Sequence, residues 1–88
     1  MYILNGQNMT DRDALWQEIR RVLEVPEYFG NNLDALHDVL GEIEGELRIL
    51  HACKMLNALG SYGCKLLEVC FDAAQENPRL TFMMGGAE

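Results

Sequence analysis

The 88-residue sequence lacks any long hydrophobic run, although 49% of its residues are hydrophobic. A membrane-spanning helix needs about 20 consecutive apolar residues, whereas runs such as Tyr2–Leu4 hold only a few. No basic start followed by a long apolar stretch suggests a secretory leader. We therefore expect a soluble, cytoplasmic protein with no membrane partner.

Cysteine is also scarce, with three residues at positions Cys53, Cys64 and Cys70. An odd number cannot pair completely into a disulfide framework, and CxxC spacing, which is typical of zinc sites, is absent. We interpret all three as buried, reduced thiols with structural roles. The sequence accordingly predicts neither a metal nor another cofactor.

Basic residues are missing from Glu24 to Glu46, a stretch that holds seven of the 14 acidic residues. The remaining seven acids are balanced by the seven Lys and Arg residues elsewhere, so the formal charge of −7 equals the charge of this one segment. Such a segment repels nucleic acid and attracts a basic protein surface over a Debye length of about 8 Å at physiological salt. The charge pattern therefore disfavours nucleic acid as a partner and favours a basic protein.

Short apolar runs near turn signals predict strands, and apolar residues at helical spacing predict helices between them. Because helices alternate with strands, we expect an α/β fold in which a three-stranded parallel β-sheet is packed with about four helices, as a single domain over residues 1–88. The expected strands are Tyr2–Leu4, Leu47–Leu50 and Leu80–Met84. The expected helices run from Thr10 until Pro26, from Asn31 or Asn32 onward, from Ala52 to Leu59 and from Ser61 to Gln75. Thr10 is expected to cap the first helix, with Asp13 three residues later.

The second predicted helix has an apolar side and an acidic side. Asp34 and Asp38 are four residues apart, which places them one above the other, and Glu42 continues the row. Like charges at this spacing destabilise an isolated helix by about 0.2–0.5 kcal/mol, and Gly41 within a helix costs about 1 kcal/mol relative to Ala. A solvated face and a face that binds a cationic group both account for the row. The expected core stripe is Leu33, Leu36, Val39, Leu40 and Ile43.

The stretch PEYFGNNLDAL, Pro26 to Leu36, followed by Asp38 and Leu40, closely resembles the signature of the barstar family of intracellular ribonuclease inhibitors. Weaker resemblance covers nearly the whole chain, including an Asn-Gly turn after the first strand and Leu-x-x-Pro at the end of the first helix. Members of that family have helices on a three-stranded parallel sheet. The resemblance therefore implies the same fold as the periodicity does.

The resemblance implies an inhibitor that covers the active site of a secreted, basic ribonuclease of the barnase type and binds no small-molecule substrate. Asp38 would take the place of an RNA phosphate, Asp34 would pair with a second basic group, and Tyr28 would supply an aromatic contact. The resemblance assigns no role to Glu42, which could add charge at the rim. The predicted partner-binding residues are Tyr28, Asn32, Asp34, Ala35, His37, Asp38, Gly41 and Glu42.

The chain departs from the family pattern at several positions, because the best-known member has tryptophan where this chain has His37 and Ile43, and Thr-Gly where it has Gly41-Glu42. An acid that the family can offer from the fourth helix aligns with Ala73, with Asp72 and Glu76 near it. His37 could replace stacking by hydrogen bonding, or it could be a solvated helix residue.

Two other functions stay open, namely a docking module for another basic protein and a small metal-dependent enzyme using Asp34, His37, Asp38 and His51. We expect no enzyme, because exposed acids on a convex helix lack the desolvation that tunes catalytic groups and no catalytic motif is present.

Overall fold

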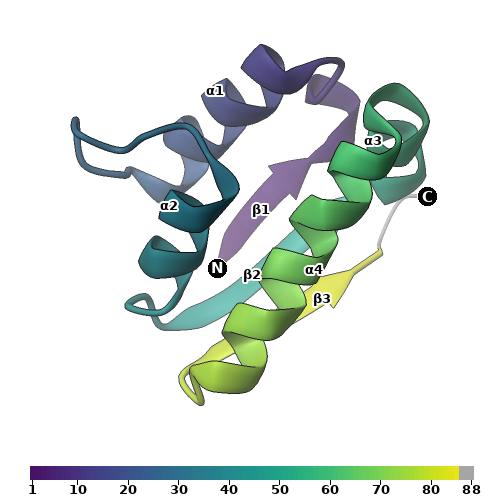
Figure 1. Ribbon diagram of the computed structural model, residues 1–88. Coiled ribbons are helices and arrows are strands. Elements are labelled where there is room, and N and C mark those ends of the chain that lie inside the picture. The colour runs from purple at the N-terminus through teal and green to yellow at the C-terminus, as the bar shows by residue number, and fades with distance from the viewer. Residues whose placement is uncertain (86–88) are drawn as a thin grey trace.

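Three parallel strands form one sheet, and the middle strand in space is also the middle strand in sequence. The computed structural model describes residues 1–85. Figure 1 shows the three strands side by side, and in their register Leu47 of the central strand pairs with Tyr2 on one side and with Phe82 on the other. The strands are β1 (Tyr2–Asn5), β2 (Gly45–Leu50) and β3 (Leu80–Met84).

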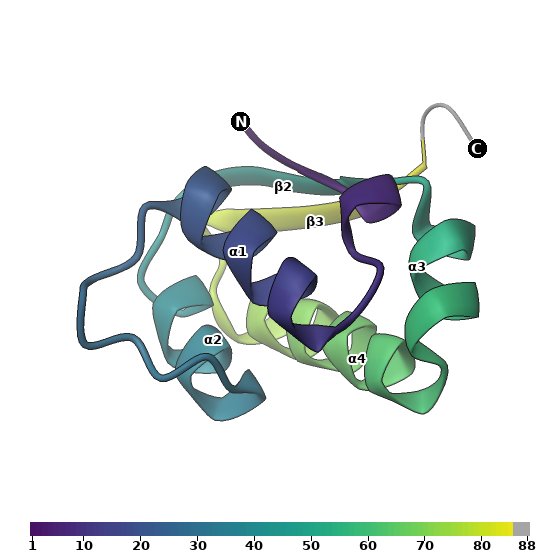
Figure 2. The ribbon, with the colours of Figure 1, turned by 90° about the horizontal axis from the view of Figure 1, so that it is seen from above.

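Two helical crossovers connect the strands. In Figure 2 the helices lie on one side of the sheet and leave its other side bare. The first crossover holds α1 (Arg12–Leu23) and α2 (Leu33–Leu40), and the second holds α3 (Ala52–Leu59) and α4 (Ser61–Glu76). A short 3₁₀ helix, η1 (Gly6–Asn8), follows β1. The predicted α/β class, with three parallel strands and four helices, is confirmed.

The two faces of the sheet differ because successive side chains of a strand point in opposite directions. Ile3, Arg48 and Met83 form a partly exposed row across the bare face, since these three residues pair across the sheet. The side chains under the helices form the centre of the hydrophobic core. They include Leu4, Leu47, Ile49 and Leu80.

The first helix differs from its prediction at both ends. Its N-cap is Asp11, not Thr10, because Asp11 has the extended backbone of a cap and its Oδ1 accepts the Ala14 N–H at 2.8 Å. The helix ends at Leu23, before Pro26, because Glu24 adopts a left-handed conformation with φ of 52°. A charged residue thus supplies the turn that glycine usually makes after a helix.

The second helix is shorter than predicted. Of the two expected starts, Asn31 and Asn32, it is Asn32 that forms the N-cap, and its Oδ1 accepts the Ala35 N–H at 2.8 Å. Gly41, however, is the C-cap and not an interior residue, so it does not impose the predicted cost on the helix. Glu42 therefore follows the helix and does not continue the helical row of Asp34 and Asp38.

The end of α2 is held from below by Asn77, which is buried directly after α4. Its side-chain amide donates to the carbonyl of Leu40 at 3.0 Å and to the carbonyl of Ile43 at 2.7 Å, and its Oδ1 accepts the Arg79 N–H. These bonds satisfy carbonyls that a helix end leaves without partners. The position of α2 consequently depends on the second crossover.

A buried acid joins β1, η1 and α1. Glu18 is only 4% exposed, and its carboxylate accepts hydrogen bonds from the Asn5 N–H, the Asn8 side chain and the Arg21 guanidinium. Burial raises the pKa of this carboxyl, but the bonds from Asn5, Arg21 and Asn8 outweigh burial and leave it below the ordinary value. We refer to Glu18 and these three partners as the Glu18 corner.

The prediction of three buried cysteines is wrong for two of them. Only Cys70 is buried, whereas Cys53 and Cys64 lie on exposed positions of α3 and α4. Burial raises the pKa of the Cys70 thiol to about 12, so this thiol stays protonated.

Within residues 1–85, no helix combines the length and the apolar character required to cross a membrane.

Candidate protein-binding site

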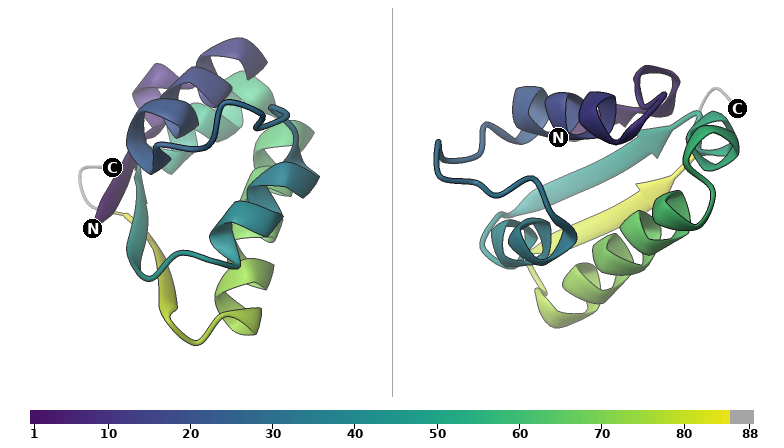
Figure 3. Two further views of the ribbon diagram at one scale, coloured as in Figure 1. Left: turned by 90° about the vertical axis from the view of Figure 1, so that its left-hand side faces the viewer. Right: turned by 45° about the horizontal axis from the view of Figure 1, so that its top comes forward.

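The acidic segment of the sequence forms the loop between α1 and α2, helix α2 itself, and the turn after it (Figure 3). Leu36 and Leu40 are buried beneath α2, which fixes the orientation of the helix. Asp34 and Asp38 consequently lie on its exposed side. The hydrophobic pattern of the helix therefore determines which side chains a partner can reach.

The acids of this surface have no counter-charge from their own chain. Asp34, Asp38 and Glu42 are exposed, and within residues 1–85 none of them has an ion-pair partner within 4.0 Å. The ion pairs that form within these residues involve other acids, namely Glu18 with Arg21, Glu46 with Arg48 and Glu76 with His37. Three negative charges are thus left to solvent or to another molecule.

A cavity of about 600 Å³ opens between the loop and α2. Its acidic lining residues are Glu24, Asp38 and Glu42, and no Lys or Arg lines it. Its apolar lining includes the buried Phe29 and the half-buried Val39. We call this cavity the acidic hollow. Its composition suits a cationic side chain, because such a chain has an apolar stem and a charged head.

The structure brings four of the predicted contact residues together around the acidic hollow, namely Tyr28, Ala35, Asp38 and Glu42. Tyr28 is 88% exposed, which is unusual for a large aromatic ring and leaves the ring free for a partner. The other four do not line the hollow. They are Asn32, which caps α2, Asp34 on its exposed face, His37 on the side toward α4, and Gly41 at the helix end.

His37 contacts an acid at the end of α4. Its Nε2 lies 3.4 Å from Oε2 of Glu76, the last residue of α4. The spacing within α2 gives no hint of this contact, because the two residues are 39 positions apart. Glu76 is therefore an additional acid at the border of the candidate site.

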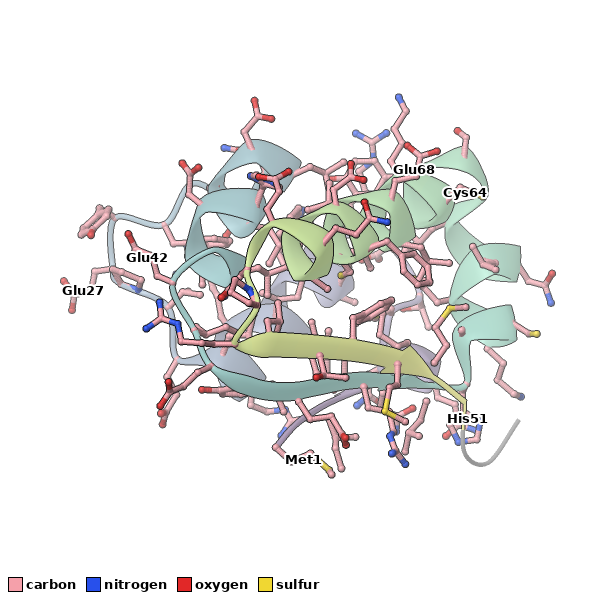
Figure 4. All side chains as sticks on the ribbon, turned by 90° about the horizontal axis from the view of Figure 1, so that it is seen from below. Met1, Glu27, Glu42, His51, Cys64 and Glu68 are labelled. Atoms are coloured by element: carbon pink, nitrogen blue, oxygen red, sulfur yellow. The ribbon has the colours of Figure 1, made fainter. Side chains whose placement is uncertain are left out.

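The side chains considered for metal binding lie at opposite ends of the molecule. Figure 4 shows Glu42 at the end formed by the loop and α2, whereas His51 lies at the other end beside α3. His51 therefore does not join Asp34, His37 and Asp38. Across residues 1–85, no group of three or more His, Cys, Asp or Glu side chains is arranged to hold a metal ion.

Comparison with known proteins agrees with this geometry. The family model described as "Barstar (barnase inhibitor)" matches residues 1–84. The chain belongs to the barstar family. It is also similar to a curated protein named "Putative ribonuclease inhibitor YrdF" from Bacillus subtilis (strain 168), with 35% identity over 77 residues, which cover 84% of this chain and 85% of that protein. The resemblance first seen in the stretch from Pro26 to Leu36 is confirmed, and this barstar-family chain is a member of a family of ribonuclease inhibitors.

The acidic hollow of this barstar-family chain includes one acid that sequence reasoning missed. Glu24 lines the hollow together with Asp38 and Glu42, although the periodicity placed it near the end of the first helix. A signal was present, because Glu24 is the first residue of the segment that lacks bases. The place of Glu24 in the lining depends on the left-handed turn of the backbone at this residue, and sequence spacing does not reveal that turn.

Proposed function

We propose that this chain inhibits a secreted ribonuclease of the barnase type by covering its active site with the loop, α2 and the acidic hollow. Asp38 takes the place of an RNA phosphate, and the chain itself carries out no catalysis. Inhibition takes place in the cytoplasm, where it protects the cell that makes the nuclease. Family membership supports the inhibitory role, and the surface described above supports the target.

The observation that carries this proposal is the exposed, unpaired carboxylate of Asp38 beside the acidic hollow. A ribonuclease active site is built to bind a phosphate anion, so it presents cationic hydrogen-bond donors at fixed positions. A carboxylate accepts the same charge-assisted hydrogen bonds as a phosphate oxygen does. Because α2 is held at both ends, Asp38 offers this charge in one defined place.

The surrounding acids support the choice of a basic partner. Glu24, Asp34 and Glu42 extend the negative field around Asp38, and within residues 1–85 none of these acids forms an ion pair. Such a field accelerates the approach of a basic protein and determines its orientation before contact. RNA itself, which carries a negative charge on every phosphate, is repelled by the same surface.

The test is an inhibition and binding assay against a panel of small basic ribonucleases. Equimolar inhibitor should abolish RNA cleavage by the cognate enzyme, and the complex should persist through size-exclusion chromatography. Asp38→Ala should weaken both effects. Glu68→Ala, which removes an exposed acid from α4, is the matched control and should leave both unchanged.

The same assay distinguishes the proposed inhibitor from the alternative, a docking module for another basic protein. A docking module would bind a basic partner through Asp38 without lowering the cleavage of RNA. Binding without inhibition across the panel would therefore overturn the proposed function. Zinc-dependent turnover by the purified chain alone would instead support the enzymatic alternative.

A further inference from the structure

The loop between α1 and α2 has an ordered path although it contains no helix or strand. It presents Tyr28, and it includes Asn31, whose φ of 37° is unusual for a residue other than glycine. A backbone bond from the Phe29 N–H to the Pro26 carbonyl closes one turn within it. A single local turn does not explain how the whole loop is held against the body of the molecule.

Arg20 of α1 supplies that connection. Its Nη2 donates to the carbonyl of Phe29 at 2.6 Å, and its Nε donates to Oδ1 of Asn31 at 2.7 Å. Its guanidinium also lies over the Phe29 ring, 5.4 Å from the centroid. Two donors of one rigid, planar group thus bind two loop residues that are separated by a single position, which fixes their relative orientation.

The bond to Asn31 is directly connected to the start of α2. A left-handed conformation at a residue other than glycine is unfavourable unless its surroundings stabilise it, and Arg20 provides such a contact. The next residue, Asn32, is the N-cap of α2 and also donates from its side chain to the carbonyl of Gly30 at 2.7 Å. A continuous set of hydrogen bonds therefore runs from α1 through the loop to the helix that carries Asp38.

The charged guanidinium of Arg20 donates its hydrogen bonds to neutral groups. It donates to a backbone carbonyl and to a side-chain amide, and within residues 1–85 no ion pair joins it to an acid. The guanidinium can therefore hold the loop without pairing with Asp38 or Glu42. The acids of the candidate site keep their charge for a partner.

We infer that Arg20 is a positioning residue that holds Tyr28–Asn32 and the first turn of α2 in the conformation that binds the nuclease. This inference rests on the proposed function, and it adds that the loop is organised before the partner arrives. Binding then does not have to order the loop, which otherwise lowers affinity. Arg20 touches the loop from beneath and does not itself line the acidic hollow.

The experiment compares Arg20→Met and Arg20→Lys with Arg21→Met. Arg21 is the neighbouring residue on the same helix, and its guanidinium bonds Glu18 instead of the loop. The control thus removes a similar number of hydrogen bonds at a site away from the loop. Lysine keeps the charge at position 20 but loses the planar pair of donors.

The first measurement is amide hydrogen exchange in the free proteins. Arg20→Met should accelerate exchange at Phe29 and at Ala35 by about tenfold or more, the size expected for losing hydrogen bonds to a charged donor. Arg20→Lys should have a smaller effect. Arg21→Met should leave these two amides unchanged relative to those of β2. Equal acceleration in Arg20→Met and Arg21→Met would overturn the inference.

The second measurement is the affinity for the cognate nuclease. Arg20→Met should weaken binding by about tenfold, and Arg21→Met should leave it unchanged at a temperature where both variants are folded. If Arg20→Met shows faster amide exchange in the loop but binds the nuclease with unchanged affinity, the inference is also overturned. If the wild-type chain binds no ribonuclease of the panel, the proposed function fails, and exchange in the free proteins decides separately whether Arg20 holds the loop.

Discussion

The Glu18 corner and the acidic hollow place carboxylates in opposite situations. Glu18 is buried, and its carboxylate accepts hydrogen bonds from three residues of its own chain. Asp38 is exposed at the edge of a cavity, and within residues 1–85 it has no ion-pair partner. Both acids are single residues on short amphipathic helices, so the difference lies in what the fold places around them.

This difference indicates two roles for charge in one small protein. The carboxylate of Glu18 connects a strand, a 3₁₀ helix and an α-helix, and its hydrogen bonds are complete without a partner. The carboxylate of Asp38 adds repulsion within α2, and within residues 1–85 it forms no ion pair in return. The Glu18 corner is therefore expected to govern stability, and the acidic hollow is expected to govern binding.

Asp38→Ala should have the largest effect, and the effect should be on binding. Truncating one member of a buried, hydrogen-bonded charge pair costs about 2–5 kcal/mol, a range informed by measurements on barnase and barstar themselves. We expect faster dissociation from the nuclease, measured by surface plasmon resonance. The free energy of unfolding should change by less than about 0.5 kcal/mol, because the residue is exposed. A loss of stability with unchanged dissociation would contradict the assignment.

Glu18→Ala should have the converse effect. Removing the carboxylate leaves the Asn5 N–H without its acceptor, and an unsatisfied buried group costs about 1–3 kcal/mol. The melting temperature should fall by about 4–8 °C for each kcal/mol in a domain of this size. Calorimetry measures this change, with Glu68→Ala as the exposed control. The folded fraction of Glu18→Ala should bind the nuclease with unchanged affinity. If the variant is fully folded and still binds more weakly, Glu18 does not act on stability alone and the inference of two separate roles is refuted.

The pH dependence of stability isolates the charge of Glu18. Because the pKa of this carboxyl is lower in the folded chain than its ordinary value of 4.5, the ionised form stabilises the fold above that value. The contribution is lost as the pH falls through the lower, folded pKa. Urea unfolding of the wild type and of Glu18→Gln should therefore differ at neutral pH and converge in acid. A difference independent of pH would show that the charge contributes nothing.

Glu42→Gln should have the smallest effect, and only on the rate of association. Glu42 is exposed in the turn after α2, where a single charge is worth less than about 1 kcal/mol. We expect association to slow by about twofold at low salt and to match the wild type near 1 M salt, where the Debye length is about 3 Å. Stopped-flow mixing at several salt concentrations measures this. An equal effect at high salt would indicate a direct contact instead.

Much of the fold follows from the sequence because the hydrophobic pattern repeats cleanly. The three strands and the helix Ala52–Leu59 were predicted, since each depends on neighbouring residues, although β1 extends to Asn5 and β2 begins at Gly45. Both ends of α1 and the C-terminal end of α2 were predicted incorrectly. Glu24 adopts a conformation more typical of glycine, and Gly41 ends a helix that its neighbours could have continued. Such choices depend on contacts that form only in the complete fold.

The candidate site was predictable in its charge but not in its shape. The base-free segment and the family resemblance pointed to Asp38, and the chain's membership in the barstar family is confirmed. The contributions of Arg20 and Glu24 required the path of the loop, which no periodicity describes. Glu18 was missed for a related reason, because an acid on a helix is ordinarily expected in solvent.

Helix α2 spans only eight residues, fewer than the roughly 12–15 that even favourable isolated helices need in water. It exists because Asn77 supports one end, Arg20 and Asn32 organise the other, and α4 packs against it. A synthetic peptide of this segment would thus be a poor inhibitor. Under the proposed function, protection from the nuclease disappears in the same cooperative transition that melts the chain, so the melting curve also sets the upper temperature at which the producing cell is safe.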